Sequence, residues 1–309
     1  MVILAAIAVA GTVVCFQRQT NARITPLMIE MAKLRIVTGD KPSAIELLDK
    51  AREAGIQDAQ TLSQIGQIYY ALAEYWKAAE VLEQVAHKES NNEETLLSLA
   101  RSYVQTGQPQ QAIAQFQRLV VLDPGNWGYY LEMGKMYEVL PDDVQALAQY
   151  QKAAEIAPEQ YTVYASQGQL FQKLENYDEA IDHYQQALRI NPDIWWIRYT
   201  LGQSYAALQQ WNRALEQFLA ALDLEPGKGG IYLEIGKVWR AQGNLEEALS
   251  WCVKGLAQSP DYVQILTEMG GIYVEFGDCA QAYTSFSRAL ELQPGNSTAQ
   301  EGLQSCQGK

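Results

Sequence analysis

The sequence predicts an all-α fold, a solenoid of stacked helical hairpins, on three observations. The stretch "NYDEAIDHYQQALRINPD" at residues 176–193 returns 34 residues later as "QWNRALEQFLAALDLEPG". With Tyr161 as position 1 and steps of 34 residues, one column is always alanine and another is mostly proline. A fixed period of this length is typical of repeat proteins, whose units stack on their neighbours to complete a core. The alanines at position 20 are Ala44, Ala78, Ala112, Ala146, Ala180, Ala214, Ala248 and Ala282.

Each unit is predicted to contain two helices. Apolar residues at positions 4, 7, 8 and 11 follow helical spacing and define the buried face of a first helix, helix A. Those at positions 20, 24, 27 and 28 define the facing stripe of helix B. Small residues at positions 8 and 20 let the two backbones approach closely, and larger side chains at position 24 fill the remaining space. Position 8 holds Ala32, Gly66, Ala100, Gly134, Gly168, Gly202, Gly236 and Gly270; position 24 holds Leu48, Leu82, Phe116, Tyr150, Tyr184, Phe218, Cys252 and Phe286.

The helix ends are predicted from glycine and proline. Glycine at position 15 can adopt the left-handed conformation that ends helix A. Proline at position 32 cannot continue helix B and therefore ends it. The glycines are Gly39, Gly107, Gly243 and Gly277, and the prolines are Pro124, Pro158, Pro192, Pro226, Pro260 and Pro294.

This pattern of alanine, small residue, aromatic residue and proline resembles the tetratricopeptide repeat (TPR) family, over about nine-tenths of the chain. The resemblance implies a right-handed superhelical α-solenoid whose A helices line a concave groove. The first unit departs from the pattern with Arg35, Arg52 and Ile56, as expected of a terminal repeat. Residues 297–309 are predicted to form a C-terminal capping helix. The eight predicted units are 25–58, 59–92, 93–126, 127–160, 161–194, 195–228, 229–262 and 263–296.

The N-terminal segment opens with 16 uncharged residues, "MVILAAIAVAGTVVCF". A helix of that length spans ~24 Å, short of the ~30 Å hydrocarbon core of a bilayer. Residues 1–17 are predicted to be a marginal membrane anchor, and residues 18–24 a linker. Two alternatives stay open: a cleaved signal ending near "AVA" at residues 8–10, and an apolar helix packed on the first repeat.

Flanking charges predict the orientation. Arg18, Arg23, Lys33 and Arg35 all follow the apolar segment, and positive charge is retained in the cytoplasm. The repeats are therefore expected on the cytoplasmic side. An exported or periplasmic location is the alternative.

Composition argues against nucleic acid and against catalysis. The net charge is −13, whereas affinity for nucleic acid depends on Lys and Arg. The four cysteines include no C-x-x-C pair, and no cofactor-binding loop is evident, so neither metal nor cofactor is predicted. His87 and His183 occupy predicted solvent-facing positions of helix B without a paired nucleophile. The sequence therefore predicts a protein that is not an enzyme.

A peptide-binding groove is predicted on the A helices. Positions 2, 5, 9 and 12 lie opposite the buried stripe. Position 5 is largely apolar and position 9 is basic or amide, with no carboxylate, so the excess acidic residues are expected on the convex face and edges. This combination fits a peptide or helical segment with apolar anchors and acidic groups. The alternative is that position-5 residues pack between A helices and the lysines only add solubility. The candidates are Leu97, Arg101, Leu131, Lys135, Trp196, Tyr199, Leu233, Lys237 and Arg240.

The predicted function is a non-catalytic, membrane-tethered scaffold for protein–protein interaction. The alternative is an assembly or regulatory factor in bacterial envelope biogenesis. The chain is similar in part to membrane-anchored bacterial TPR proteins such as lipopolysaccharide assembly protein B, which also place an anchor before cytoplasmic repeats. It lacks the cysteine-rich metal module of that protein.

Overall fold

A computed structural model describes residues 24–54, 57–89 and 91–307, and those residues are helical apart from short turns. The predicted anchor at residues 1–17 lies outside the described residues, as does Ile56. Within the part of the chain that is described, none of the helices combines the length and the apolarity needed to cross a membrane.

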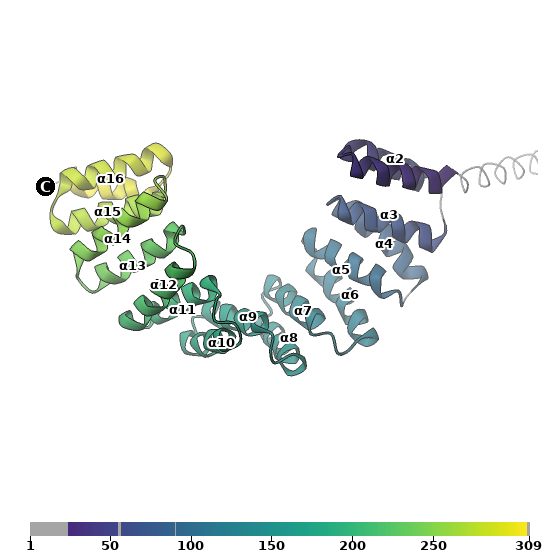
Figure 1. Cartoon of the computed structure of the whole chain (residues 1–309), viewed down its shortest axis with the longest axis horizontal. Coiled ribbons are helices and arrows are strands. Elements are labelled where there is room, and N and C mark those ends of the chain that lie inside the picture. The colour runs from purple at the N-terminus through teal and green to yellow at the C-terminus, as the bar shows by residue number, and fades with distance from the viewer. Residues whose placement is uncertain (1–23, 55–56, 90, 308–309) are drawn as a thin grey trace, which may run out of the picture. The chain divides into compact units, whose positions relative to one another are not determined.

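The described chain forms an all-α array of helical hairpins, as predicted (Figure 1). Residues 24–37 form the first described helix. The helices that follow are α2 (Lys41–Glu53), α3 (Ala59–Ala71), α4 (Tyr75–Lys88), α5 (Glu93–Gln105), α6 (Pro109–Leu122), α7 (Trp127–Val139), α8 (Asp143–Ile156), α9 (Tyr161–Lys173), α10 (Tyr177–Ile190), α11 (Trp195–Ala207), α12 (Trp211–Leu224), α13 (Gly229–Ala241), α14 (Leu245–Gln258), α15 (Val263–Phe276), α16 (Cys279–Leu292) and α17 (Ser297–Gln307). From α3 onward, the odd-numbered helices up to α15 are the A helices and their even-numbered successors are the B helices.

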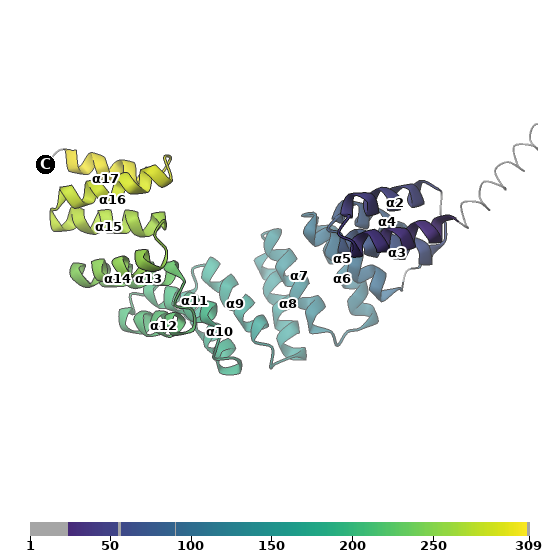
Figure 2. The same cartoon turned by 45° about the horizontal axis from the view of Figure 1, so that its top comes forward.

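The hairpins group into two compact units, one ending at Ile156 and the other beginning at Ala157. Within each unit, consecutive helices pack against each other, and so do successive A helices: α3 on α5 in the first unit, and α11 on α13 and α13 on α15 in the second. In Figure 2, α15, α16 and α17 lie side by side at the C-terminal end of the second unit. The A helices of each unit therefore share one face, called here the A-face.

The close approach of helices A and B is confirmed by burial. All eight alanines at position 20 are 0% exposed. At position 8, the glycines lie directly against the position-24 side chain of the partner helix. A Cβ atom on Gly202 would lie 2.6 Å from Cε1 of Phe218, and one on Gly134 would lie 2.3 Å from Cε1 of Tyr150. Such distances are far below van der Waals contact, so in these two hairpins the ring at position 24 occupies the space that a side chain at position 8 would need. The unit 93–126 combines Ala100 with Phe116, so the pairing of glycine with a ring does not hold in every hairpin.

The turn after helix A is left-handed at position 15, as predicted for the glycines: Gly39, Gly107, Gly243 and Gly277 have φ between 69° and 81°. The same conformation occurs where the residue is not glycine, at Ala73 (φ 64°), Glu175 (φ 59°) and Gln209 (φ 57°). In each turn the residue after position 15 donates its backbone N–H to the carbonyl of position 11, for example Asn176 to Phe171 at 2.9 Å. The turn geometry is therefore set by helix packing and capping even where it opposes the preference of the residue.

Gly168→Ala is expected to destabilise the protein by about 1 to 3 kcal/mol, because the added methyl group would overlap the ring of Tyr184. Urea unfolding followed by circular dichroism measures the change. Gly227→Ala is the matched control, because no atom lies within 4 Å of the position its Cβ would take. Equal effects of the two substitutions would contradict the packing described here.

Glu175→Gly is expected to raise the free energy of unfolding by ~0.5 kcal/mol or more, since relief of left-handed strain exceeds the added chain entropy of glycine. The reciprocal change Gly243→Ala should lower it, because Gly243 holds φ 80°. Thermal and urea unfolding of the two variants give the comparison. A loss of stability in Glu175→Gly would show that the side chain of Glu175 contributes more than the backbone conformation costs.

Candidate functional site

The nine predicted groove residues divide between the two units. Leu97 and Arg101 lie on α5, and Leu131 and Lys135 lie on α7, all in the first unit. The other five belong to the second unit: Trp196 and Tyr199 on α11, and Leu233, Lys237 and Arg240 on α13. All nine lie on A helices, and each unit is considered by itself.

The apolar row at position 5 is mostly buried, which corrects the prediction for two residues. Leu131 is 7% exposed and Leu233 is 5% exposed. Leu233 packs in a core with Ile265 and Met269 of the next A helix, α15. Leu97 is half-buried and packs against the core of the first unit. Leu233 therefore follows the alternative, in which position 5 fills the space between neighbouring A helices. Leu131 is also buried, so it offers little surface to a ligand.

The basic row at position 9 is largely paired with carboxylates three residues earlier. Lys135 Nζ lies 2.7 Å from Glu132 Oε1, and Lys237 Nζ lies 2.9 Å from Glu234 Oε1. The A helices thus carry acidic residues, contrary to the expectation that the carboxylates lie on the convex face and edges. Exposed pairs of this kind contribute little to stability, so the lysines can exchange partners. Arg101 is exposed and has no ion pair with any residue that the structure describes.

Arg240 joins two helices, which corrects its assignment to a ligand groove. Its Nη1 donates to Glu268 Oε1 at 2.9 Å, and its Nη2 donates to Glu275 Oε1 at 2.7 Å, both on α15. A Cβ on Gly271 would lie 2.9 Å from Nη2 of Arg240. The guanidinium therefore lies over the backbone of Gly271. Burial of Arg240 opposes its charge, but the hydrogen bonds that the guanidinium donates to Glu275 and Glu268 raise its pKa.

Five half-buried residues on and beside the A helices of the second unit are grouped here under the name aromatic notch: Trp196, Tyr199, Gly230, Glu234 and Tyr262. Gly230 occupies position 2 of α13, and a Cβ there would lie 3.3 Å from the hydroxyl of Tyr262 and 3.9 Å from that of Tyr199. The two phenol groups therefore converge on a stretch of backbone without a side chain. Burial, with Glu234 and Tyr262 nearby, raises the pKa of Tyr199 to about 12, so its hydroxyl keeps its proton as a hydrogen-bond donor.

Neighbouring side chains hold the aromatic notch in place. The Tyr199 ring lies 5.8 Å from the ring of Phe218 and 6.5 Å from that of Trp195. The Nζ of Lys228 lies 5.1 Å from the Trp195 ring, a cation–π contact. Arg198 donates from Nε to the carbonyl of Pro192 at 3.1 Å. Tyr199 of the aromatic notch is thus packed against ring neighbours, Phe218 and Trp195, and Trp195 in turn contacts Lys228.

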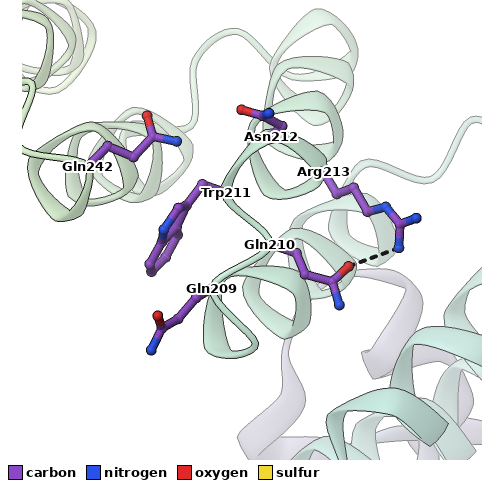
Figure 3. Close-up of a pocket in the computed structure, with 6 residues that line it drawn as sticks. All are labelled: Gln209, Gln210, Trp211, Asn212, Arg213 and Gln242. Atoms are coloured by element: carbon purple, nitrogen blue, oxygen red, sulfur yellow. Dashed lines mark hydrogen bonds between the residues drawn. The ribbon is translucent and has the colours of Figure 1, made fainter.

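A cavity that the repeat pattern did not predict lies at the turn between α11 and α12 (Figure 3). It has a volume of about 310 Å³, and in Figure 3 Arg213 donates to Gln210 across its edge, at 2.9 Å. A second cavity of about 300 Å³ is lined by residues of α10, α11 and α12, among them Tyr205 and Arg189. Both are shallow, and the first is rich in amide groups; the spacing of apolar residues does not predict cavities of this kind, because their lining includes polar side chains outside the buried stripes. The first is lined by Gln209, Gln210, Trp211, Asn212, Arg213 and Gln242.

Among the described residues, Cys252 and His183 lie in packed surroundings. Cys252 is buried, and burial raises the pKa of its thiol to about 12. His183 is not on the solvent side as predicted: it is half-buried and stacks on Phe171 with ring centroids 5.2 Å apart. Burial lowers the pKa of its imidazole despite nearby Asp182 and Glu179. No group of three His, Cys, Asp or Glu side chains suited to a metal ion occurs in residues 24–54, 57–89 and 91–307.

Comparison with known proteins identifies the class. Family models described as "Tetratricopeptide repeat" match residues 97–161, 161–194 and 199–263. The chain belongs to the tetratricopeptide repeat family. Members of this family are typically non-catalytic scaffolds, and the fold supports protein–protein interaction. Comparison with curated proteins gave no match.

Solved structures share the fold. The C-terminal part of a TPR protein from Cytophaga hutchinsonii superposes with TM-score 0.65 at 21% identity, covering 77% of this chain and 98% of that one. YrrB, described as a TPR protein with an unusual peptide-binding site, gives TM-score 0.51 at 24% identity, with 61% and 97% coverage. PilW, a type IV pilus biogenesis factor, gives TM-score 0.59 at 19% identity, with 68% and 98% coverage. The partial resemblance to lipopolysaccharide assembly protein B is not confirmed by these comparisons and stays a prediction.

Arg240→Gln is expected to destabilise the second unit by about 1 to 2 kcal/mol, because Glu268 and Glu275 lose the cation that they share. This magnitude lies between the values typical of exposed and of buried ion pairs. Urea unfolding at low and high salt measures the change. Lys237→Gln is the control, since its single partner, Glu234, is on its own helix. If Arg240→Gln is as stable as Lys237→Gln, the ion pairs of Arg240 do not stabilise the contact between α13 and α15, and its side chain is available to a ligand.

Proposed function

We propose that this protein is a membrane-tethered scaffold that binds a segment of a partner protein on the A-face of its second unit, at the aromatic notch. The proposal rests above all on the convergence of the Tyr199 and Tyr262 hydroxyls beside half-buried Gly230, where no side chain is present. The partner segment is an extended peptide or a helix with an apolar anchor and acidic groups.

The chemistry of the aromatic notch supports an apolar anchor. Trp196 and Tyr199 are both half-buried, and they lie one turn apart on α11, so they can cover two sides of an inserted side chain. Aromatic residues in partly desolvated positions contribute a large share of the energy at protein interfaces. Donors at the hydroxyls of Tyr199 and Tyr262 can bind the carbonyl groups of the incoming chain.

Lys237 supports recognition of an acidic group. Lys237 belongs to the same helix as Gly230 and Glu234, and its side chain is 47% exposed. A carboxylate on the partner can compete with Glu234 for this cation, because the exposed intrahelical pair is weak. In the first unit, Arg101 and half-buried Leu97 offer the same combination of cation and apolar surface on α5.

The membrane tether and the cytoplasmic location are proposed from the sequence. Residues 1–16 carry no charge, and the basic residues that follow favour retention of the repeats in the cytoplasm. Reporter fusions after residue 309 test the orientation: activity of a cytoplasm-dependent reporter is expected, and activity of a periplasm-dependent one would contradict it.

A role in bacterial envelope biogenesis is the second candidate, and it rests on the same arrangement of an apolar N-terminal segment before repeats. Deletion should then alter the composition of lipid A or reduce viability. Growth and lipid A unchanged by deletion would leave the general scaffold as the proposed function.

Trp196→Ala is expected to weaken partner binding at least tenfold while the fold is kept, because the anchor loses one wall of its site. Random peptides selected on the immobilised full chain provide the ligands, and fluorescence anisotropy measures their affinity. Trp76→Ala is the matched control, since Trp76 is 65% exposed and lies on α4, a B helix. Charge reversal by Lys237→Glu should weaken binding of the acidic peptides more than of neutral ones. Selected peptides that bind Trp196→Ala and the native chain equally would disprove the assignment of the notch.

A further inference from the structure

The N-terminal end of the described array carries an exposed apolar stripe, defined as Ile24, Leu27, Met31 and Leu34. These side chains are 45%, 60%, 42% and 62% exposed, in that order. Terminal repeats of a solenoid normally present a polar outer face to water. Four large apolar side chains in a row at this end therefore indicate a surface that another molecule covers.

The C-terminal end follows the usual rule and provides a contrast. The last described helix, α17, covers the core with Ala299, which is 0% exposed, and Leu303, which is half-buried. Its exposed residues include Gln300, Glu301 and Gln304. The apolar stripe is thus specific to the N-terminal helix.

The apolar stripe points away from the core of the first unit. On the same helix, Ile29 and Ala32 are buried and join the core that contains Ala44 and Leu48 of α2. At ~100° per residue, the centre of the stripe lies about 150° around the helix from this buried face. A second helix can therefore approach the stripe without displacing α2.

The spacing of the apolar stripe is that of a coiled-coil seam. Its residues are separated by three, four and three positions, so Ile24 and Met31 take position a of a heptad, and Leu27 and Leu34 take position d. Glu30 then falls at position g and Arg35 at position e. In a parallel pair of identical helices, a residue at position g of one chain faces the position-e residue of the other chain that is five residues further along the sequence. Glu30 of each copy therefore lies opposite Arg35 of the other copy.

We propose that a second copy of this chain covers the apolar stripe, with the two helices of residues 24–37 packed in parallel and paired through Glu30 and Arg35. The present partners of these residues, Lys33 at 2.7 Å and Asp40 at 3.5 Å, are exposed and easily exchanged. Opposite charges at matching positions identify a copy of this helix in preference to a lipid surface or a folded-back apolar segment, neither of which would need this charge pattern.

The expected association is weak. A helix of this length buries less than the ~800 Å² per partner of a standard interface. The helix is already ordered by its packing on α2, so the pair does not have to supply the free energy of helix formation. Dissociation constants in the micromolar range or above are therefore expected for the full chain in solution.

Charge-reversal variants test the parallel pairing. Sedimentation equilibrium of the full chain in a neutral detergent should show a concentration-dependent dimer. Glu30→Lys and Arg35→Glu should each raise the dissociation constant about tenfold, since each places like charges opposite each other twice. An equimolar mixture of the two variants should associate as well as the native chain, because both pairs in the mixed dimer are again of opposite charge.

The other arrangements give different results. An antiparallel pair would leave the single variants as strongly associated as the native chain, because like charges already face each other there. Coverage by lipid or by residues 1–16 would leave the full chain with no dimer that these variants weaken. The double variant Leu27→Ser with Leu34→Ser should abolish the dimer, whereas Val121→Ser with Val144→Ser should not, although those valines are 82% and 77% exposed. Failure of the mixed variants to associate would overturn the proposal, whatever the fate of the peptide site on the second unit.

Discussion

The close approach of helices A and B within each hairpin is the constraint on which the rest of the structure depends. Alanine at position 20 is fully buried in every unit, and the glycines at position 8 leave no room for a Cβ. An aromatic ring at position 24 fills the space that the small residues create, as Phe218 does over Gly202. This arrangement fixes the distance and register of the two helices, and with them which faces are left to solvent.

The same constraint decides which side chains are available for binding. Position 5 is buried at Leu131 and Leu233, and at Leu233 the cause is the contact between the A helices α13 and α15. The proposed peptide site includes Trp196 and Tyr199, where an aromatic side chain stands at a position that is smaller in the other units. In the proposed function, recognition of a partner would therefore depend on residues outside the packing columns.

Local features of the fold could be predicted from the sequence because they depend on short-range spacing. The buried alanines and the left-handed glycines follow from residues within one hairpin. The side-chain partners could not be predicted, since they depend on rotamers and on the next hairpin. The sequence therefore predicts Arg240 as a groove residue, although it forms ion pairs with Glu268 and Glu275 of α15. The left-handed turn at Glu175 shows that packing and capping can override the preference of a residue. The division of the array after Ile156 could not be predicted either, because the 34-residue repeat continues across it without an insertion or deletion.

A double-mutant cycle at Gly202 and Phe218 tests the central constraint most directly. The free energies of unfolding of Gly202→Ala, Phe218→Leu and the double variant are compared with that of the native chain. Because the added methyl group and the ring would occupy the same space, the double variant should be more stable than the sum of the single effects predicts, by ~1 kcal/mol or more. Additive effects would show that position 8 and position 24 do not limit the approach of the two helices, and would contradict the account.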